Sequence, residues 1–123
     1  TNGEASAIAI GRAVYVSGAD AGKLANANSS ATTNVVGLVG ATSIASSATG
    51  AIAFAGVLTA TAVQWDAVTG QSGGLTPGAT YFLSNTNNGA LTTTAPTSGH
   101  VVPVGSALGT TRMRLGFGPV VAL

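Results

Sequence analysis

Only a few side chains in this sequence have the chemistry of an active site. They are three carboxylates, Glu4, Asp20 and Asp66, and one histidine, His100, with no cysteine. Two carboxylates facing each other across a groove would be the arrangement of a glycosidase. Such a site also needs aromatic platforms for the sugar, and aromatic residues make up only 5% of the chain. The sequence therefore predicts no enzyme, with a carbohydrate-active enzyme built on the three carboxylates as an alternative.

Three of these residues have simpler structural explanations. Asp20 and Asp66 fall in different predicted turns, where we expect them to hydrogen-bond backbone amides. His100 has no second histidine or nearby carboxylate to orient it, so we expect a polar side chain at the start of a strand. A metal ion would need three copies of His100 gathered on a threefold axis. No Gly-rich turn leads into a Lys-Ser or Lys-Thr step, so a P-loop is excluded, and we predict no cofactor.

Charge is scarce along the whole chain, with four basic and three acidic side chains and a formal net charge of +1. A chain without a basic stripe is not expected to bind nucleic acid or an acidic membrane surface. No segment approaches the length of about 18 uninterrupted apolar residues that a transmembrane helix needs. Arg112 and Arg114 are the one close pair of cations, and strand alternation places them on the same face. They are either a solvated strand face or a contact to an acidic partner surface.

The apolar content indicates a thin core. Hydrophobic residues make up 46% of the chain, but alanine, which buries little area, supplies many of them. The large side chains are few: Tyr15, Phe54, Trp65, Tyr81, Phe82, Met113 and Phe117. We expect Trp65 to be the largest piece of the core. A thin core and a weakly charged surface together favour burial against other subunits.

Strands are predicted throughout, because glycine is spread along the chain and helix signals are weak. Short apolar or alternating runs separated by turns favour a small, single-domain, all-β sandwich or barrel of short antiparallel strands. These runs are residues 13–16, 23–25, 34–41, 51–55, 57–59, 63–65, 80–84, 90–93, 101–108 and 112–117. We assign residues 11–123 to one all-β module, and residues 1–10 to an N-terminal arm or linker.

Three of these runs predict more detail. Residues 34–41 are almost continuously apolar, as in a strand buried on both faces. In residues 51–55 small and large side chains alternate, so one face of the strand should point inward. Pro103 removes a ladder donor from its strand, which should therefore lie at a sheet edge or carry a bulge.

Turn and strand signatures carry a family resemblance over nearly the whole chain. In the second half they are GGLTPGATYFLS at 73–84, NGALT at 88–92 and VGSAL at 104–108. In the first half they are VGLV at 36–39, GAIAFAG at 50–56 and the opening run Gly11-Arg12-Ala13-Val14-Tyr15-Val16. This order resembles a β-rich module that recurs in virion proteins of tailed bacteriophages, among them capsid decoration (cement) proteins, head fibres and some tail fibres.

The resemblance implies a structural virion protein on the exterior of the capsid. As a decoration protein it would bind and stabilise the shell of the major capsid protein, commonly as a homotrimer. The alternative is a head- or tail-fibre domain, in which the loops at 70–78 and 85–89 would meet a host glycan or surface protein. No catalytic residue comes with the resemblance.

Contacts between subunits are expected from two regions. One is the proline-containing strand with the arginine pair, and the other is the C-terminal segment 118–123, whose apolar end is unsuited to solvent. The candidate interface residues are Pro103, Arg112, Arg114, Pro119, Val120, Val121 and Leu123.

Overall fold

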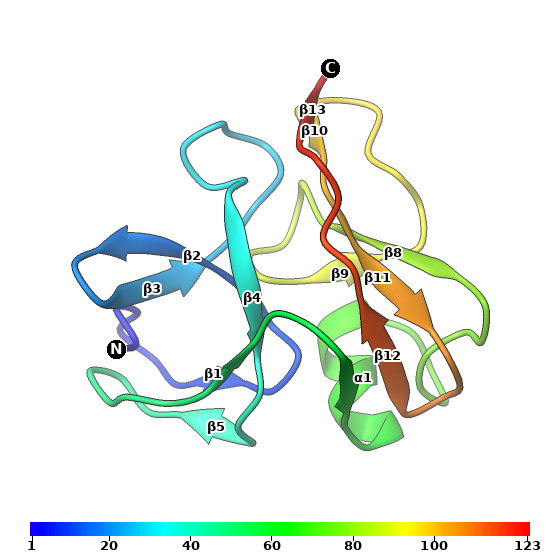
Figure 1. The fold of residues 1–123 in the computed structure, drawn as a ribbon, viewed down its shortest axis with the longest axis horizontal. Coiled ribbons are helices and arrows are strands. Elements are labelled where there is room, and N and C mark those ends of the chain that lie inside the picture. The colour runs from blue at the N-terminus through cyan, green and yellow to red at the C-terminus, as the bar shows by residue number, and fades with distance from the viewer.

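The computed structural model describes residues 1–123 as thirteen short strands and one helix (Figure 1). The five-stranded sheet contains, in spatial order, β7 (Val57–Thr59), β12 (Arg112–Leu115), β11 (Pro103–Ala107), β8 (Thr80–Leu83) and β9 (Leu91–Thr92). The four-stranded sheet contains β3 (Ala21–Leu24), β2 (Ala13–Gly18), β4 (Val35–Val39) and β6 (Ile52–Ala53). Two ribbons pair β1 (Ile8–Ala9) with β5 (Ser43–Ile44), and β10 (His100–Val101) with β13 (Val121–Ala122).

All strand pairs in the four sheets are antiparallel. The prediction of a mostly β chain of short antiparallel strands is therefore confirmed. None of the sheets closes on itself, so the strand order alone does not define a barrel.

The main core draws on both larger sheets, which lie on opposite sides of the molecule in Figure 1. Leu38 of the four-stranded sheet and Tyr81 and Met113 of the five-stranded sheet are all fully buried. Trp65 is 0% exposed, which confirms its predicted place in the core. Its indole Nε1 donates a 2.9 Å hydrogen bond to the carbonyl of Thr111, so its one polar atom is satisfied.

The helix α1 (Ala62–Thr69) corrects the prediction of a strand over residues 63–65. The hydroxyl of Thr61 accepts a hydrogen bond from the amide of Gln64, and the Gln64 side chain accepts one from the amide of Thr61. This capping box satisfies free amides of the first turn, and Gly70 ends the helix in the left-handed conformation at φ 73°. With eight residues, α1 has far less than the length of a membrane crossing, and no longer apolar helix is present.

Two of the predicted strands contain a residue that is more exposed than the sequence suggested. Phe54 lies beyond the end of β6 and is 71% exposed, so it does not belong to the predicted inward face. Val36 is also exposed, because the β2–β4 register shifts between the pairs Val14–Gly37 and Tyr15–Val35 and leaves Val36 unpaired. That bulge turns one residue of an otherwise buried strand toward solvent.

Pro103 lies in a bulge and not at a sheet edge. The strand β11 is the middle strand of its sheet, and its pairing with β8 shifts register between Pro103 and Gly105. The bulge accommodates the missing donor of the proline within a central strand. One of the two predicted alternatives is thereby confirmed.

Residues 1–10 pack against the rest of the chain in this structure, although the sequence suggested an arm or linker. Ile8 and Ile10 are buried, and the side-chain amide of Asn2 donates to the carbonyls of Ser6 and Ile44 at 2.9 and 2.8 Å. Asn2 also forms an isolated bridge with Gly22. Strand β1 of the segment pairs with β5, and the amide of Gly3 donates to the carbonyl of Gly22 in β3 at 2.8 Å.

Candidate interaction surfaces

The three carboxylates do not converge on one site. One oxygen of Glu4 accepts a hydrogen bond from the amide of Leu24 at 2.8 Å. The two oxygens of Asp66 accept from the amides of Gly73 and Gly74 at 3.1 and 2.8 Å. The Asp20 side chain is exposed and accepts no hydrogen bond from the protein, and no three His, Asp or Glu side chains cluster together. The predicted backbone-binding role is confirmed for Asp66 and not for Asp20.

Removing the Asp66 carboxylate tests this structural role. We expect Asp66→Ala to lower the free energy of unfolding by about 1–3 kcal/mol, because two loop amides lose a charged acceptor. The matched control is Asp20→Asn, which alters a carboxylate without hydrogen-bond partners in its own chain and, in protein dilute enough to be monomeric, should stay within about 0.5 kcal/mol of the parent. Urea denaturation followed by tryptophan fluorescence measures both variants. Equal stability of the two variants would contradict the assignment.

His100 is half-buried at the start of β10, as expected for a polar residue at that position. Its backbone amide donates to the carbonyl of Ala27 at 2.8 Å, and its Nδ1 lies 3.1 Å from the same oxygen. These contacts tie β10 to the loop that precedes β4. The sequence predicts no metal site, and an ion shared by three copies of His100 is an alternative that a single chain does not test.

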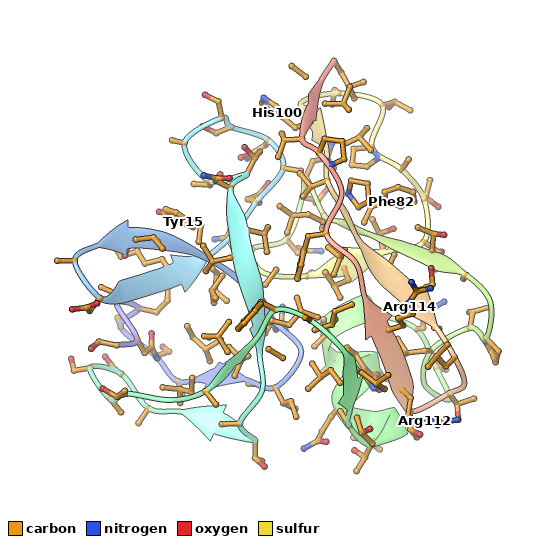
Figure 2. All side chains as sticks on the ribbon, in the orientation of Figure 1. Tyr15, Phe82, His100, Arg112 and Arg114 are labelled. Atoms are coloured by element: carbon orange, nitrogen blue, oxygen red, sulfur yellow. The ribbon has the colours of Figure 1, made fainter.

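The outer face of the five-stranded sheet carries both arginines of the predicted interface. Met113 and Leu115 are buried, so Arg112 and Arg114 point outward from β12, as Figure 2 shows. Cross-strand pairing places Arg114 opposite Val57 and Arg112 opposite Thr59. Neither guanidinium has a hydrogen-bond or ion-pair partner within the chain, so both are free to meet an acidic group.

Four of the five remaining predicted interface residues lie along the C-terminal segment, and the fifth, Pro103, is in β11. The amide of Gly118 donates to the carbonyl of Pro103 at 3.1 Å, and the amide of Leu123 donates to the carbonyl of Gly99 at 2.9 Å. These bonds hold the segment along β10, where Val121 pairs with Val101. Three apolar side chains stay exposed there, and with Pro119 they form what we call the C-terminal ribbon surface: Pro119, Val120, Val121 and Leu123.

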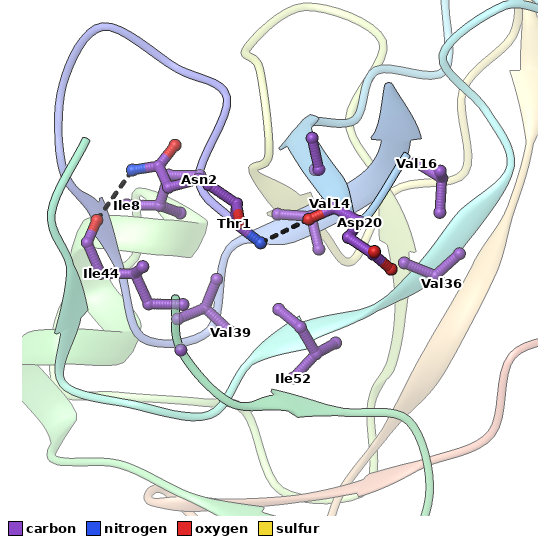
Figure 3. A pocket seen from close by; sticks show the side chains of 13 residues that line it. Thr1, Asn2, Ile8, Val14, Val16, Asp20, Val36, Val39, Ile44 and Ile52 are labelled. Carbon is purple, nitrogen blue, oxygen red and sulfur yellow. Dashed lines mark hydrogen bonds between the residues drawn. The ribbon is translucent and has the colours of Figure 1, made fainter. Parts of the chain in front are cut away.

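An apolar pocket lies on the face of the four-stranded sheet turned away from the main core (Figure 3). Its volume is about 260 Å³. Large apolar side chains from five separate strands line it: Ile8, Val14, Val16, Val36, Val39, Ile44 and Ile52. Thr1, Asn2 and Asp20 add polar groups to the lining, and the Thr1 nitrogen donates to the carbonyl of Asp20 at 2.7 Å. The pocket has the lining expected for an apolar side chain or fragment.

A polar trough lies near the turn between β8 and β9. Two adjoining hollows of about 480 and 270 Å³ share Ser84, Thr86 and Thr92. Arg12 lies at one end, and its guanidinium donates to the carbonyls of Ala67 and Asn88 at 2.9 and 3.3 Å. No carboxylate side chain lines either hollow.

No protein-family model, curated protein or solved structure matches this chain. The function therefore has to be inferred from the surfaces of the chain itself. Sequence reasoning identified the outward arginines from the alternation of β12. It missed the apolar pocket, because the residues that line it come from segments spread between positions 1 and 52. The alternation of Val14 and Val16 in β2 was the one local signal for a second apolar face.

Proposed function

We propose that this chain is a structural virion protein, a capsid decoration protein that binds the outside of a tailed-bacteriophage capsid and stabilises the major capsid protein shell. The observation that carries the proposal is the large number of apolar side chains that stay exposed, on a chain whose three carboxylates do not converge on one site. The exposed large hydrophobic residues are Val16, Val36, Phe54, Val57, Val63, Leu108, Val120, Val121 and Leu123. Such side chains serve association better than catalysis.

The size of the molecule supports assembly with several neighbours. The chain exposes 5833 Å² of surface, and a standard protein interface covers about 800 Å² of each partner. Two subunit contacts and a capsid contact would cover a large part of this surface. Each Å² of apolar surface that they bury would stabilise the assembly by about 25 cal/mol. The proposal includes a homotrimer and, at the level of fold, a sandwich-like packing of the two larger sheets.

Capsid binding is the direct test of this function. Purified protein is mixed with capsids that lack it and sedimented, and the heat stability of bare and decorated capsids is compared. The proposal predicts saturable binding and a higher disruption temperature for decorated capsids. If the protein stays in the supernatant and bare capsids are equally stable, the proposal is wrong.

The C-terminal ribbon surface gives a prediction about assembly. Deleting Val120–Leu123 should shift the oligomer toward monomer, because it removes three exposed apolar side chains and the β13 edge. Sedimentation velocity over a range of concentrations measures the shift. Leu108→Ala is the control, since it trims an exposed apolar side chain outside the ribbon. An unchanged mass after the deletion would contradict the predicted contact.

A fibre domain that adheres to the host surface is the second candidate, and the polar trough favours it. The loop at 85–89 contributes Asn85, Thr86 and Asn87 to the two hollows, and hydroxyl and amide groups of this kind suit a glycan. Saturable binding to host cells that is lost in Thr86→Ala and Asn87→Ala would support this role. Equal binding of the parent and both variants to cells would count against it.

A further inference from the structure

The apolar pocket lacks an occupant from its own chain. Ile8, Val14, Val39 and Ile44 form its buried floor, and Val16 at its rim is 59% exposed. An engineered apolar cavity of about 150 Å³ is large enough to bind benzene. The pocket, at about 260 Å³, therefore has room for one phenyl ring with its methylene group. The rim is open, so an occupant can arrive from outside.

Phe54 is the exposed aromatic side chain that fits such a pocket. It follows β6 at the start of the turn into β7, and it does not line the pocket of its own chain. Phe82 and Phe117, the other two phenylalanines, are both partly buried. Aromatic side chains that insert into pockets are typical anchors of protein interfaces.

The charges near the apolar pocket and near Phe54 are complementary. Asp20 is the only carboxylate that lines the pocket, and its two side-chain oxygens accept no hydrogen bond within the chain. The Thr1 nitrogen bonds the backbone carbonyl of Asp20, which leaves the carboxylate free. Arg112 and Arg114 are exposed on the sheet that β7 joins directly after the turn with Phe54.

We propose that the apolar pocket of one copy receives Phe54 of a second copy, with Asp20 of the first copy facing Arg112 and Arg114 of the second. The contact joins two different surfaces, so copies related by rotation can close into a ring. This contact would hold together the homotrimer of the proposed function. The number of copies, three, rests on that proposed function. The contact itself requires no capsid.

The test uses the purified chain and two substitutions at exposed positions. Phe54→Ala removes the inserted side chain, and Val16→Asp places a second carboxylate at the pocket rim. Each should convert a parent oligomer into monomer, with at least a tenfold rise in the dissociation constant measured by sedimentation. Val63→Ala, at a 78% exposed helix position, is the control and should keep the parent mass. Circular dichroism confirms that each variant is folded.

Mixing the two variants gives a sharper readout. Phe54→Ala keeps an intact pocket and Val16→Asp keeps an intact Phe54, so a mixture should form a 1:1 complex that neither variant forms alone. A monomeric parent, or a Phe54→Ala variant with the parent mass, would overturn the inference. An oligomer that behaves as predicted but does not bind capsids would refute the proposed function and leave this contact standing.

Discussion

Replacing Trp65 with alanine is expected to lower the free energy of unfolding by about 3–5 kcal/mol, the usual loss for a fully buried large aromatic side chain. Trp65 is 0% exposed, and its ring and its bond to Thr111 join α1 to the start of β12. Domains of this size have a total stability of about 5–15 kcal/mol, so the variant should be close to unfolding at room temperature. Guanidinium denaturation followed by circular dichroism provides the measurement.

Val63→Ala is the matched control for Trp65. Val63 lies on the same helix, two residues earlier, and is highly exposed. Its replacement should change stability by no more than about 0.5 kcal/mol. A loss below about 1.5 kcal/mol for Trp65→Ala, half the lower end of the usual range, would mean that the helix does not contribute to the core as described.

Gly74→Ala is expected to destabilise the chain by about 3 kcal/mol, because the new side chain causes both backbone strain and a steric clash. Gly73→Ala causes the backbone strain alone and so separates the two. Both glycines have positive φ, 81° for Gly73 and 92° for Gly74, so a side chain strains the backbone at either position. A Cβ atom at Gly74 would lie 2.4 Å from the carbonyl oxygen of Thr110, whereas one at Gly73 would meet nothing within 4 Å.

The comparison of the two glycine variants isolates the steric clash. Gly73→Ala should cost only about 1 kcal/mol, the strain of the left-handed conformation. Asp66 binds the amides of both residues, so loss of that contact would affect the two variants alike. Thermal unfolding of the pair measures the difference, and equal midpoints would contradict the close approach of Gly74 to Thr110.

Local patterns predicted those parts of the fold that depend on neighbouring residues. The predicted runs at 80–84 and 90–93 form the β8–β9 hairpin, and the alternation of β12 places Arg112 and Arg114 outward. Pro103 predicted a sheet edge or a bulge because a missing amide restricts any strand, and β11 has the bulge. In each case the signal and its consequence lie within a few residues of each other.

The sequence misled where the decisive contacts are distant or the signals conflict. Val63 and Trp65 favour strands, but the capping box between Thr61 and Gln64 and the stop at Gly70 produce a helix. The exposure of Phe54 depends on where β6 ends, which its alternating neighbours do not reveal. The pocket, likewise, exists only once five separate strands have brought their apolar side chains together.

Antibody labelling of intact virus particles tests the central claim most directly. An antibody raised against this chain is applied with gold to particles of a tailed phage that carries it, and the gold is located by electron microscopy. Capsid decoration predicts gold spread over the head and none on the tail. Gold confined to the tail tip, or particles without gold, would contradict it.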